Sequence, residues 1–382
     1  SISTHNSVTT LGSNMFADTA LTSITIPSNI TTISANAFSG ITTLLTVVMN
    51  TGSVVFSTIF SGITTITSVT FDYAGAIPAN SCLSTTSLTS VTIGNTITSI
   101  GSNAFKLCTN AALTSITIPV SIASVGTDAF TGVPLTTVVM NSGSVVFATI
   151  FTGVNTITSV TFDYAGAIPA NSCLSVTNLT SVTIGNTITS IGTYALSGTG
   201  LTGTITIPNS VLTIDDAAFY NCNGLTSVTL GNSLTTLNSH CFNSCSGLTS
   251  INFPNSITSI GDQSFYGCSS LTTITIPDSV TSIGASAFIV CTGLTSIIFD
   301  GTPTLTSLSD NVFRYCAGVT SITIPDSVTN IGSYALGSCS GLTSITIPTS
   351  VTSIGSYAFI SCIGLTSLTF TATSTLTPIA QE

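Results

Sequence analysis

The sequence has very little charge. Asp, Glu, Lys and Arg make up 4% of its 382 residues, against about a quarter in an ordinary soluble protein. Two residues are basic, Lys106 and Arg314, and twelve are acidic, so the net charge is −10. Nucleic acids are held by Lys and Arg against the phosphates, and anionic membrane surfaces attract the same residues. The composition therefore argues against nucleic acid as a partner and against binding to anionic membranes.

Long apolar runs and a targeting segment are also missing. No run of about 18 apolar residues occurs, because Ser or Thr interrupts the Ile, Val, Leu and Phe residues every one or two positions. Disorder requires low hydrophobicity and high charge, the reverse of this composition. We therefore expect a fully folded chain without membrane insertion. Ser1 is not followed by a basic segment, so we expect any signal peptide to have been removed or to lie outside this sequence.

What the sequence does contain is one phrase repeated from end to end. The phrase "LTSITI" recurs in sixteen copies, most of them 22 or 23 residues apart, and steps of 24 or 25 mark short insertions such as "CTNAAL". The opening "SISTHNSV" aligns with "SITIPNSV", so we expect a seventeenth copy there without its leading Leu-Thr. The leading apolar residues are Leu21, Leu44, Ile66, Leu88, Leu113, Leu135, Ile157, Leu179, Leu201, Leu225, Leu248, Leu271, Leu294, Val319, Leu342 and Leu365.

A longer period lies on top of the short one. "TVVMNTGSVVFSTIFSG" at Thr46 returns with few changes at Thr137, 91 residues later, and this offset equals four repeats. The sequence therefore indicates two duplicated blocks at about 44–134 and 135–225. Regular 23-residue repeats follow at about 225–370, and a degenerate tail covers 371–382. We expect all of them to form one solenoid domain over 1–382.

The short period also predicts the fold. A period of 20–29 residues with apolar residues at i, i+3 and i+5 is typical of leucine-rich solenoids. In "LTSITIP" the Leu and both Ile should point inward, and Ser and the second Thr outward. In "SVTSIGSYAF" Val and Ile should point inward, Gly should make the turn, and Ala-Phe should fill the interior. We predict a right-handed, β-rich leucine-rich repeat solenoid of about 17 rungs and about 80 Å. A parallel sheet should form one face, and short strands or turns the other.

Two residue types should form columns inside this solenoid. Seven cysteines each stand three residues before a leading residue, and we expect buried, reduced thiols that act as small apolar groups rather than inter-rung disulfides. They are Cys222, Cys245, Cys268, Cys291, Cys316, Cys339 and Cys362. The expected phenylalanine column is Phe16, Phe38, Phe105, Phe130, Phe219, Phe242, Phe265, Phe288, Phe313 and Phe359.

At this point the sequence resembles a known family. "IPDSVTSIGASAFIVCTGLTSI", which begins at Ile276, looks like the BspA-type leucine-rich repeat. That family is known for surface proteins of bacteria and protists and also occurs in large DNA viruses. The resemblance covers nearly the whole chain, is strong in the later copies, and is looser where "FDYAGAIPANSC" replaces the usual second half. It implies the solenoid fold and a location outside the cell or on a cell or virion surface.

Few residues suggest chemistry, and each has a structural explanation that we prefer. His240, Cys241 and Cys245 do not have the spacing of a zinc site, and Cys245 already belongs to the cysteine column. No Ser-His-Asp arrangement can be assembled. Asn29 and Asn178 begin Asn-x-Thr sequons, which are expected by chance in a chain so rich in Thr. We expect no catalytic residue, no cofactor and no metal.

The acidic residues lead to the same expectation. Asp72 and Asp163 occupy equal places in the two duplicated blocks, and Asp215 and Asp216 are adjacent. Paired acids can bind calcium or act as acid and base, but no calcium-loop pattern surrounds these residues. We expect them to be turn or edge residues that help solubility, and we expect that the protein is not an enzyme.

The outward strand positions form the most informative surface. The position before the first inward Ile or Val is Ser or Thr in all sixteen copies, and two residues later Thr fills twelve of sixteen. Protein-binding solenoids usually vary this face and place aromatic and Arg anchors on it, so uniformity argues against one specific partner. The candidate contact face consists of Ser23, Thr25, Ser90, Thr92, Ser115, Thr117, Ser181, Thr183, Thr273, Thr275, Ser344 and Thr346.

Three functions of different classes remain open. The first is a structural or adhesive surface protein. Neither end of the sequence shows a polar cap, so we also expect self-association, head to tail into filaments. The second is a binding module for a surface protein or a glycan, which the lack of anchor residues disfavours. The third is ice binding through a grid of hydroxyls and methyls, with spacings of about 7 Å along a strand and about 5 Å between strands.

Overall fold

A computed structural model describes residues 7–371. The chain divides into two compact units, Ser1–Tyr164 and Ala165–Glu382. Each unit is a parallel β-solenoid, and there are about 16 turns in all. The first six residues of the expected seventeenth copy, and all of the tail except Thr371, lie outside the described residues. Whether the two units form one rigid domain stays a prediction.

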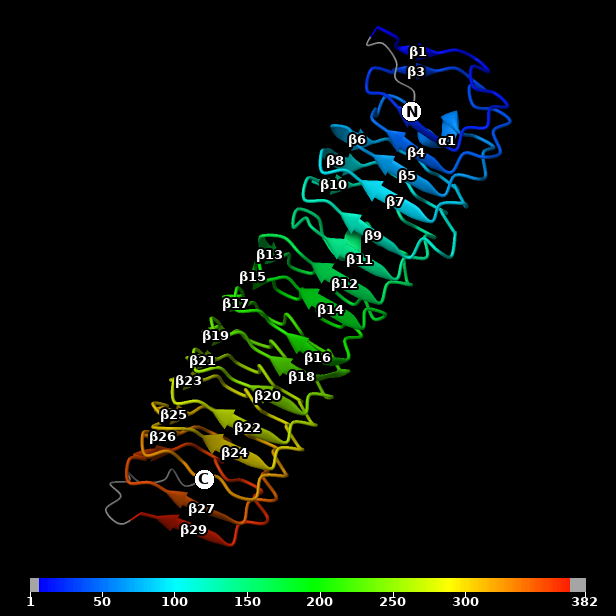
Figure 1. Cartoon of the computed structure of the whole chain (residues 1–382). Helices are drawn as coiled ribbons and strands as arrows, with labels where there is room; N and C mark the ends of the chain where they lie inside the picture. The colour runs from blue at the N-terminus through cyan, green and yellow to red at the C-terminus, as the bar shows by residue number, and fades with distance from the viewer. Residues whose placement is uncertain (1–6, 372–382) are drawn as a thin grey trace. The chain divides into compact units, whose positions relative to one another are not determined.

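In the first unit, two sets of short strands lie on opposite sides of the turns (Figure 1). We call the strands that carry the "SITI" phrase the front strands and those of the second half-repeat the back strands. The front strands are β2 (Ser23–Ile26), β4 (Thr46–Met49), β5 (Ser68–Phe71), β7 (Ser90–Ile93), β9 (Ser115–Ile118), β11 (Thr137–Met140) and β12 (Ser159–Phe162). The back strands are β1 (Thr10–Leu11), β3 (Thr32–Ile33), β6 (Gly75–Ile77), β8 (Ile97–Ile100) and β10 (Ser124–Val125).

The second unit repeats this arrangement. Its front strands are β14 (Ser181–Ile184), β16 (Gly203–Thr206), β18 (Leu225–Thr229), β20 (Ser250–Asn252), β22 (Thr273–Ile276), β24 (Ser296–Phe299), β27 (Ser344–Ile347) and β29 (Ser367–Phe370). Its back strands are β13 (Gly166–Ile168), β15 (Ile188–Ile191), β17 (Thr213–Ile214), β19 (Thr236–Leu237), β21 (Ser259–Ile260), β23 (Ser282–Ile283), β25 (Ser307–Leu308), β26 (Asn330–Ile331) and β28 (Ser353–Ile354).

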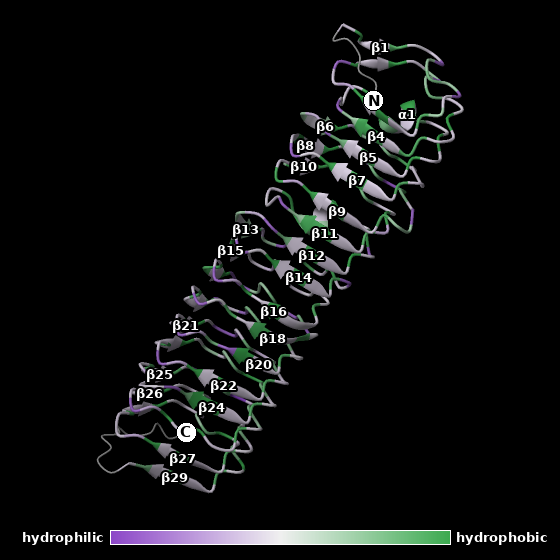
Figure 2. Cartoon of the chain, viewed as in Figure 1, coloured by the Kyte–Doolittle hydropathy of each residue, from purple (hydrophilic) through white to green (hydrophobic). Residues whose placement is uncertain are grey.

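Pairing between rungs joins residues at equal positions of the repeat. Ser23 pairs with Thr46 and Ile24 with Val47, in parallel, and the same register recurs in the second unit between β22 and β24. Ile24 and Ile26 are 2% and 0% exposed, while Ser23 is exposed. The predicted inward and outward faces of the repeat are therefore confirmed. In Figure 2 the front strands are coloured white to green, and purple, hydrophilic segments lie in the connections.

The back of the solenoid differs from the prediction in two turns of the first unit. Helices α1 (Phe56–Ile59) and α2 (Phe147–Ile150) replace the expected short strand or turn. They begin at the final Phe of the "TGSVVF" and "SGSVVF" segments of the two duplicated blocks, in which the Gly-Ala-Phe turn of the ordinary repeat is missing. The main-chain N–H groups of Ile59 and Phe60 bond within their own turn, to Val55 and Phe56, instead of to the next rung.

The front sheet is also less continuous than predicted. In the first unit β2, β4, β5 and β7 form one sheet, and β9 pairs only onward with β11. The break between β7 and β9 coincides with the inserted "CTNAAL" segment. In the second unit β16–β18–β20, β22–β24 and β27–β29 are separate sheets. The turn at 320–324 contributes only a single bridge, between Thr323 and Thr346. The inserted residues account for the break between β7 and β9, whereas the turn at 320–324 carries the same SITI phrase as β2 and β27 and has no explanation in its own sequence.

Stacked phenylalanine rings fill the interior, as the sequence predicts. In the second unit the ring centroids of Phe242 and Phe265 are 5.6 Å apart, and those of Phe265 and Phe288 are 5.1 Å apart with an interplanar angle of 4°. In the first unit Phe60 and Phe151, next to the helices, extend the column by packing on Phe38 and Phe130. The sequence pattern missed these two residues because their turns do not carry the Ala-Phe signature.

The glycine that precedes Ala-Phe in the second half of the ordinary repeat has a different role from the one that we expected. We predicted that it makes the turn, yet Gly284 does not adopt a positive φ; two residues later Ser286 does, at 60°. A Cβ atom on Gly284 would lie 2.4 Å from the main-chain nitrogen of Asp262 in the preceding rung. Glycine is therefore required here because neighbouring rungs approach too closely for a side chain.

The cysteine column has a hydrogen-bonding role in addition to packing. All eleven cysteines are buried and free. The Sγ atoms of Cys268 and Cys291 each donate to the carbonyl of the phenylalanine in the preceding rung, Phe242 and Phe265, at 3.2 Å. Cys245, Cys316, Cys339 and Cys362 make the same kind of contact to the rung before them. These carbonyls also accept the main-chain N–H three residues later in their own rung, as Phe265 does from Cys268. The thiol thus adds a second, weak hydrogen bond that links consecutive rungs.

The first prediction concerns the phenylalanine column. Phe265→Ala removes a ring that is 0% exposed and touches two neighbouring rings, so it should lower the free energy of unfolding by about 3–5 kcal/mol. The control is Thr275→Ala on the exposed front face, which should cost less than about 0.5 kcal/mol. Urea unfolding measures both. Equal losses for the two variants would contradict the assignment of the faces.

The second prediction concerns the cysteines at high pH. Burial raises the pKa of Cys268 and of Cys339 to about 12, whereas an unfolded thiol has a pKa of about 8.5. The unfolded chain therefore loses these protons first, so stability should be constant below pH 8 and fall as the pH rises toward 12.

Urea midpoints between pH 7 and pH 11 test this expectation, and Cys268→Ala should flatten the curve relative to the unchanged chain. Native thiols should also resist iodoacetamide at pH 8 until urea is added. Alkylation of the folded chain as fast as that of the unfolded chain would show that the column is open.

Candidate contact face

The candidate contact face consists of the outward residues of the front strands. In each strand these residues alternate with buried ones, so Thr273 and Thr275 are exposed while Ile274 and Ile276 are buried. Of the twelve predicted contact residues, Thr25 is half-buried and the other eleven are exposed. The structure places six of these residues, from Ser23 to Thr117, in the first unit and six, from Ser181 to Thr346, in the second.

Hydroxyl groups in this protein fall into two classes. One class is structural: Thr249, Thr272 and Thr295, which follow the leading leucines, each donate a side-chain hydrogen bond to a main-chain carbonyl of the preceding rung. A second structural column does the same on the back, as Thr281 does to Thr258. These threonines stabilise the stacking of rungs and are therefore not available for a partner.

The hydroxyls of the contact face belong to the other class. Among the twelve residues, within the part of the chain that the structure describes, only Thr346 forms a side-chain hydrogen bond, to Thr369 at 3.0 Å. The remaining hydroxyls point away from the core and can both donate and accept. A face of this kind carries no charge, so covering it costs less hydration free energy than covering a charged face, provided that its hydroxyls find new partners. It offers hydrogen bonds in many equivalent positions.

A groove hollows the face in the second unit. A groove of about 970 Å³ lies over the front strands β14, β16, β18 and β20. Thr183, Thr204, Thr206 and Thr229 line it together with asparagines of the following turns, such as Asn209. Its lining contains no charged residue. The groove follows the hydroxyl column across several rungs, so it is a continuation of the contact face rather than a separate site.

Ile298 is the main departure from this polar pattern. It occupies an outward position of β24 where most copies have Thr, and it is 45% exposed. Together with Phe299, Pro303 and Pro325 it lines an apolar depression of about 380 Å³, beside the turn that has no full strand. The contact face therefore includes one apolar spot, which the sequence showed only as an exception to the Thr column.

The residues suspected of chemistry do not form a site. His240 is half-buried, whereas Cys241 and Cys245 are fully buried, and the Sγ atom of Cys241 lies 3.6 Å from the carbonyl of Ile214. Within residues 7–371 no group of three or more His, Cys, Asp and Glu side chains comes together. The amide of Asn29, in the first sequon, donates to the carbonyl of Val8.

The aspartates lie where edge residues were expected. Asp72 and Asp163 are exposed, at the ends of β5 and β12. Asp216 accepts a hydrogen bond from the main-chain nitrogen of Ser239 in the next rung at 3.1 Å, and Asp310 does the same for Ser333 at 2.7 Å. These carboxylates link consecutive rungs.

Sequence reasoning missed one cluster in the second unit. The guanidinium of Arg314 lies 4.7 Å from the ring centroid of Tyr315 and 4.3 Å from that of Tyr334. Tyr334 in turn stacks on Tyr357, with centroids 4.9 Å apart. Arg314 also donates to the side chain of Asn311 and has no carboxylate partner among the described residues, whereas Lys106 in the first unit pairs with Asp128. The 23-residue spacing of the two stacked tyrosines was the available signal.

Comparisons with known proteins agree with the fold. The family model described as BspA type leucine rich repeat region (6 copies) matches residues 1–75, 75–202, 189–316 and 258–381. No curated protein sequence matches the chain. Within residues 7–371, none of the helices has the length and apolar character that crossing a membrane requires.

Several solved structures are similar. A leucine rich cell surface protein from Faecalibacterium prausnitzii is 25% identical, with 95% of this chain and 92% of that chain covered and a TM-score of 0.42. A leucine-rich repeat protein from Bacteroides ovatus is 24% identical, with coverage of 98% and 88% and a TM-score of 0.48. The family model covers nearly the entire sequence in overlapping matches, and the parallel turns of both units have the expected architecture. The chain belongs to the BspA-type leucine-rich repeat family.

Proposed function

We propose that this chain is a non-enzymatic, extracellular or surface-exposed repeat protein with a structural or adhesive role, and that the hydroxyl contact face makes its contacts. The observation that carries the proposal concerns the twelve contact residues: eleven are exposed, and within residues 7–371 only Thr346 forms a side-chain hydrogen bond. The family is generally non-catalytic and is known for surface proteins, which supports both the role and the location.

The physical basis is a weak contact repeated many times. An exposed hydroxyl contributes about 1 kcal/mol or less to a contact, but the same geometry recurs on every rung, so many weak bonds can form together. The net charge of −10 opposes association between copies, and salt screens this repulsion. We therefore expect self-association that is weak at low salt and stronger at about 0.15 M salt.

The test is sedimentation velocity of the purified chain over a range of concentrations and salt. The double variant Thr183→Lys with Thr275→Lys places a charge at the centre of two front strands and should abolish association. The control, Asn255→Lys with Ser356→Lys, adds equal charge at exposed turn positions and should associate like the unchanged chain. A chain that stays monomeric at millimolar concentration would contradict self-association.

Head-to-tail assembly into filaments is a separate prediction that the same variants address. Association that persists in Thr183→Lys with Thr275→Lys, and that appears as rods by negative-stain microscopy, would assign the contact to the ends of the solenoid instead of the face. Ice binding by the hydroxyl grid stays a third proposal. It is weakened by the division of the front face into short sheets, and a thermal-hysteresis measurement tests it.

A second candidate function, a binding module for a protein or glycan, is favoured by the Arg314–Tyr315–Tyr334–Tyr357 cluster. Arg and Tyr are the residue types that dominate binding energy at interfaces, and Tyr315 and Tyr357 are 40% and 44% exposed. If this cluster binds a protein or glycan partner, Tyr357→Ala should weaken the affinity for that partner at least tenfold. Tyr194→Ala, which removes an equally exposed tyrosine, should not. Equal behaviour of the two variants would exclude the cluster.

A further inference from the structure

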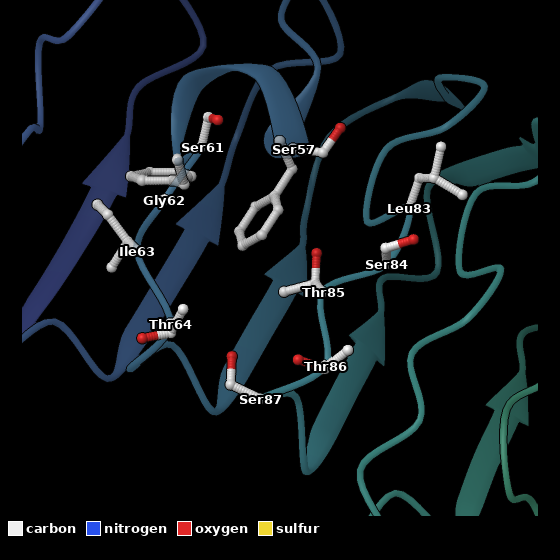
Figure 3. A pocket seen from close by; sticks show the side chains of 12 residues that line it. Ser57, Ser61, Gly62, Ile63, Thr64, Leu83, Ser84, Thr85, Thr86 and Ser87 are labelled. Atoms are coloured by element: carbon white, nitrogen blue, oxygen red, sulfur yellow. The ribbon is translucent and has the colours of Figure 1, made fainter.

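The first unit contains a small polar pocket next to helix α1. Its volume is about 200 Å³, and it lies between the segment 56–64, which includes α1, and the segment 83–87 of the following turn. Figure 3 shows Ser57, Ser61 and Ile63 on the α1 side, and Leu83 and Thr85 on the side of the following turn. Phe56 and Phe60 also line the pocket, although they are only 1% and 4% exposed.

The helix explains why the pocket exists. Between two ordinary turns, three main-chain N–H groups at alternate residues donate hydrogen bonds to carbonyls of the next rung. Asn80, Cys82 and Ser84 form one such set. From the α1 turn, only the N–H of Ser57 reaches the next rung, at the carbonyl of Ser81, 2.6 Å away. The N–H groups of Thr58 and Ile59 bond instead to the carbonyl of Val55 in their own turn. The two turns therefore separate on this side and leave a gap that the repeat elsewhere closes.

The separation leaves hydrogen-bonding groups without partners. The main-chain carbonyl of Lys106, one repeat after Leu83, accepts a hydrogen bond from the N–H of Ser84 in the preceding rung. The carbonyl of Leu83 has the equivalent position but accepts no hydrogen bond among the described residues. Five of the seven hydroxyl side chains that line the pocket also form no intramolecular hydrogen bond in the described part of the chain: Ser61, Thr64, Ser84, Thr85 and Thr86. Ser57 and Ser87 donate to the carbonyls of Asn80 and Ile66 and keep acceptor capacity.

The hydroxyls are not required by the fold. In the duplicated block, 91 residues later, the sequence has Ala148 in place of Ser57 and Val176 in place of Thr85. The helix of that block, α2, forms all the same, with Phe147 buried as Phe56 is. The helical turn therefore forms without these two hydroxyls. Ser57 has one structural contact, because it donates to the carbonyl of Asn80, whereas no intramolecular hydrogen bond among the described residues explains the hydroxyl of Thr85.

We propose that this pocket binds a neutral, hydroxylated ligand, namely a single pyranose sugar or the terminal sugar of a glycan. No charged residue lines the pocket, so an ionised ligand would lose hydration without a counter-charge. Free hydroxyls and an unpaired carbonyl provide both donors and acceptors, as a sugar ring requires. The volume equals about seven water molecules at roughly 30 Å³ each, which is too large for one structural water and matches one sugar ring.

The proposal is independent of the contact face, because none of the twelve face residues lines the pocket. A ligand of about twelve heavy atoms in so shallow a site should bind with a Kd on the order of 1 mM. Loss of one hydroxyl that bonds the ligand should weaken binding about three- to tenfold.

The test is saturation-transfer NMR titration of the purified chain with methyl glucoside, methyl galactoside, methyl mannoside and N-acetylglucosamine, and with glycerol as a small polyol. At least one sugar should bind in the millimolar range and more tightly than glycerol. Thr85→Val and Ser57→Ala, which copy the duplicated block, should each weaken it. Thr98→Val is the matched control, since it removes an exposed hydroxyl of β8 that belongs neither to the pocket nor to the contact face, and it should leave binding unchanged.

Each outcome decides the question. Melting curves for the three variants, expected to coincide with that of the unchanged chain, show that any loss of binding is local. Absence of binding at 100 mM of every sugar would overturn the proposal, as would glycerol binding equal to the sugars or equal binding by Thr85→Val and the unchanged chain. Loss with Thr98→Val would show that the sugar does not bind in the pocket and would also overturn the proposal. Tighter binding of oligosaccharides that end in the same sugar, also lost in Thr85→Val, would identify a glycan end as the ligand.

Discussion

Each rung must place its main-chain groups against those of the next rung in parallel register, and the other features of both units depend on this constraint. A residue at one repeat position therefore has as neighbours the residues at the same position one repeat before and after. The environment of each position is the same along the unit, and so the same residue type is stable there again and again. This explains the columns of Phe, Cys and structural Thr, and it explains the close approach that requires glycine at Gly284.

Where the repeat is regular, the sequence predicted the structure well. The inward positions of the front strands, the Phe column and the buried cysteines follow from the spacing of residues alone, because each repeat copies the environment of the previous one. The pattern failed where a turn has a different local sequence. It could not foresee α1 and α2, because a four-residue helix depends on where N–H groups find acceptors rather than on a period. It also did not reveal the breaks in the front sheet, since only some of them lie at insertions and others separate repeats of ordinary length.

The candidate site was predictable to the same extent. The exposure of the Ser and Thr face followed from the alternation of strand residues. Which hydroxyls are free did not follow, since Thr272 and Thr275 differ only in position, yet Thr272 donates to the preceding rung. The Arg314 cluster was missed because its members come from different turns and meet only when those turns stack. Family membership supplies the fold and the general role, whereas partners have to be sought at the places where the repeat is irregular.

The duplication of 91 residues has a consequence for how such a chain changes over time. Because each turn contacts mainly its two neighbours, inserting a whole number of repeats preserves every contact except those at the junction. The inserted copy can then accumulate substitutions while the original retains its chemistry, as Ser57 and Ala148 illustrate. A solenoid gene of this type can therefore diversify its surfaces within one polypeptide, in the way that separate genes do after duplication.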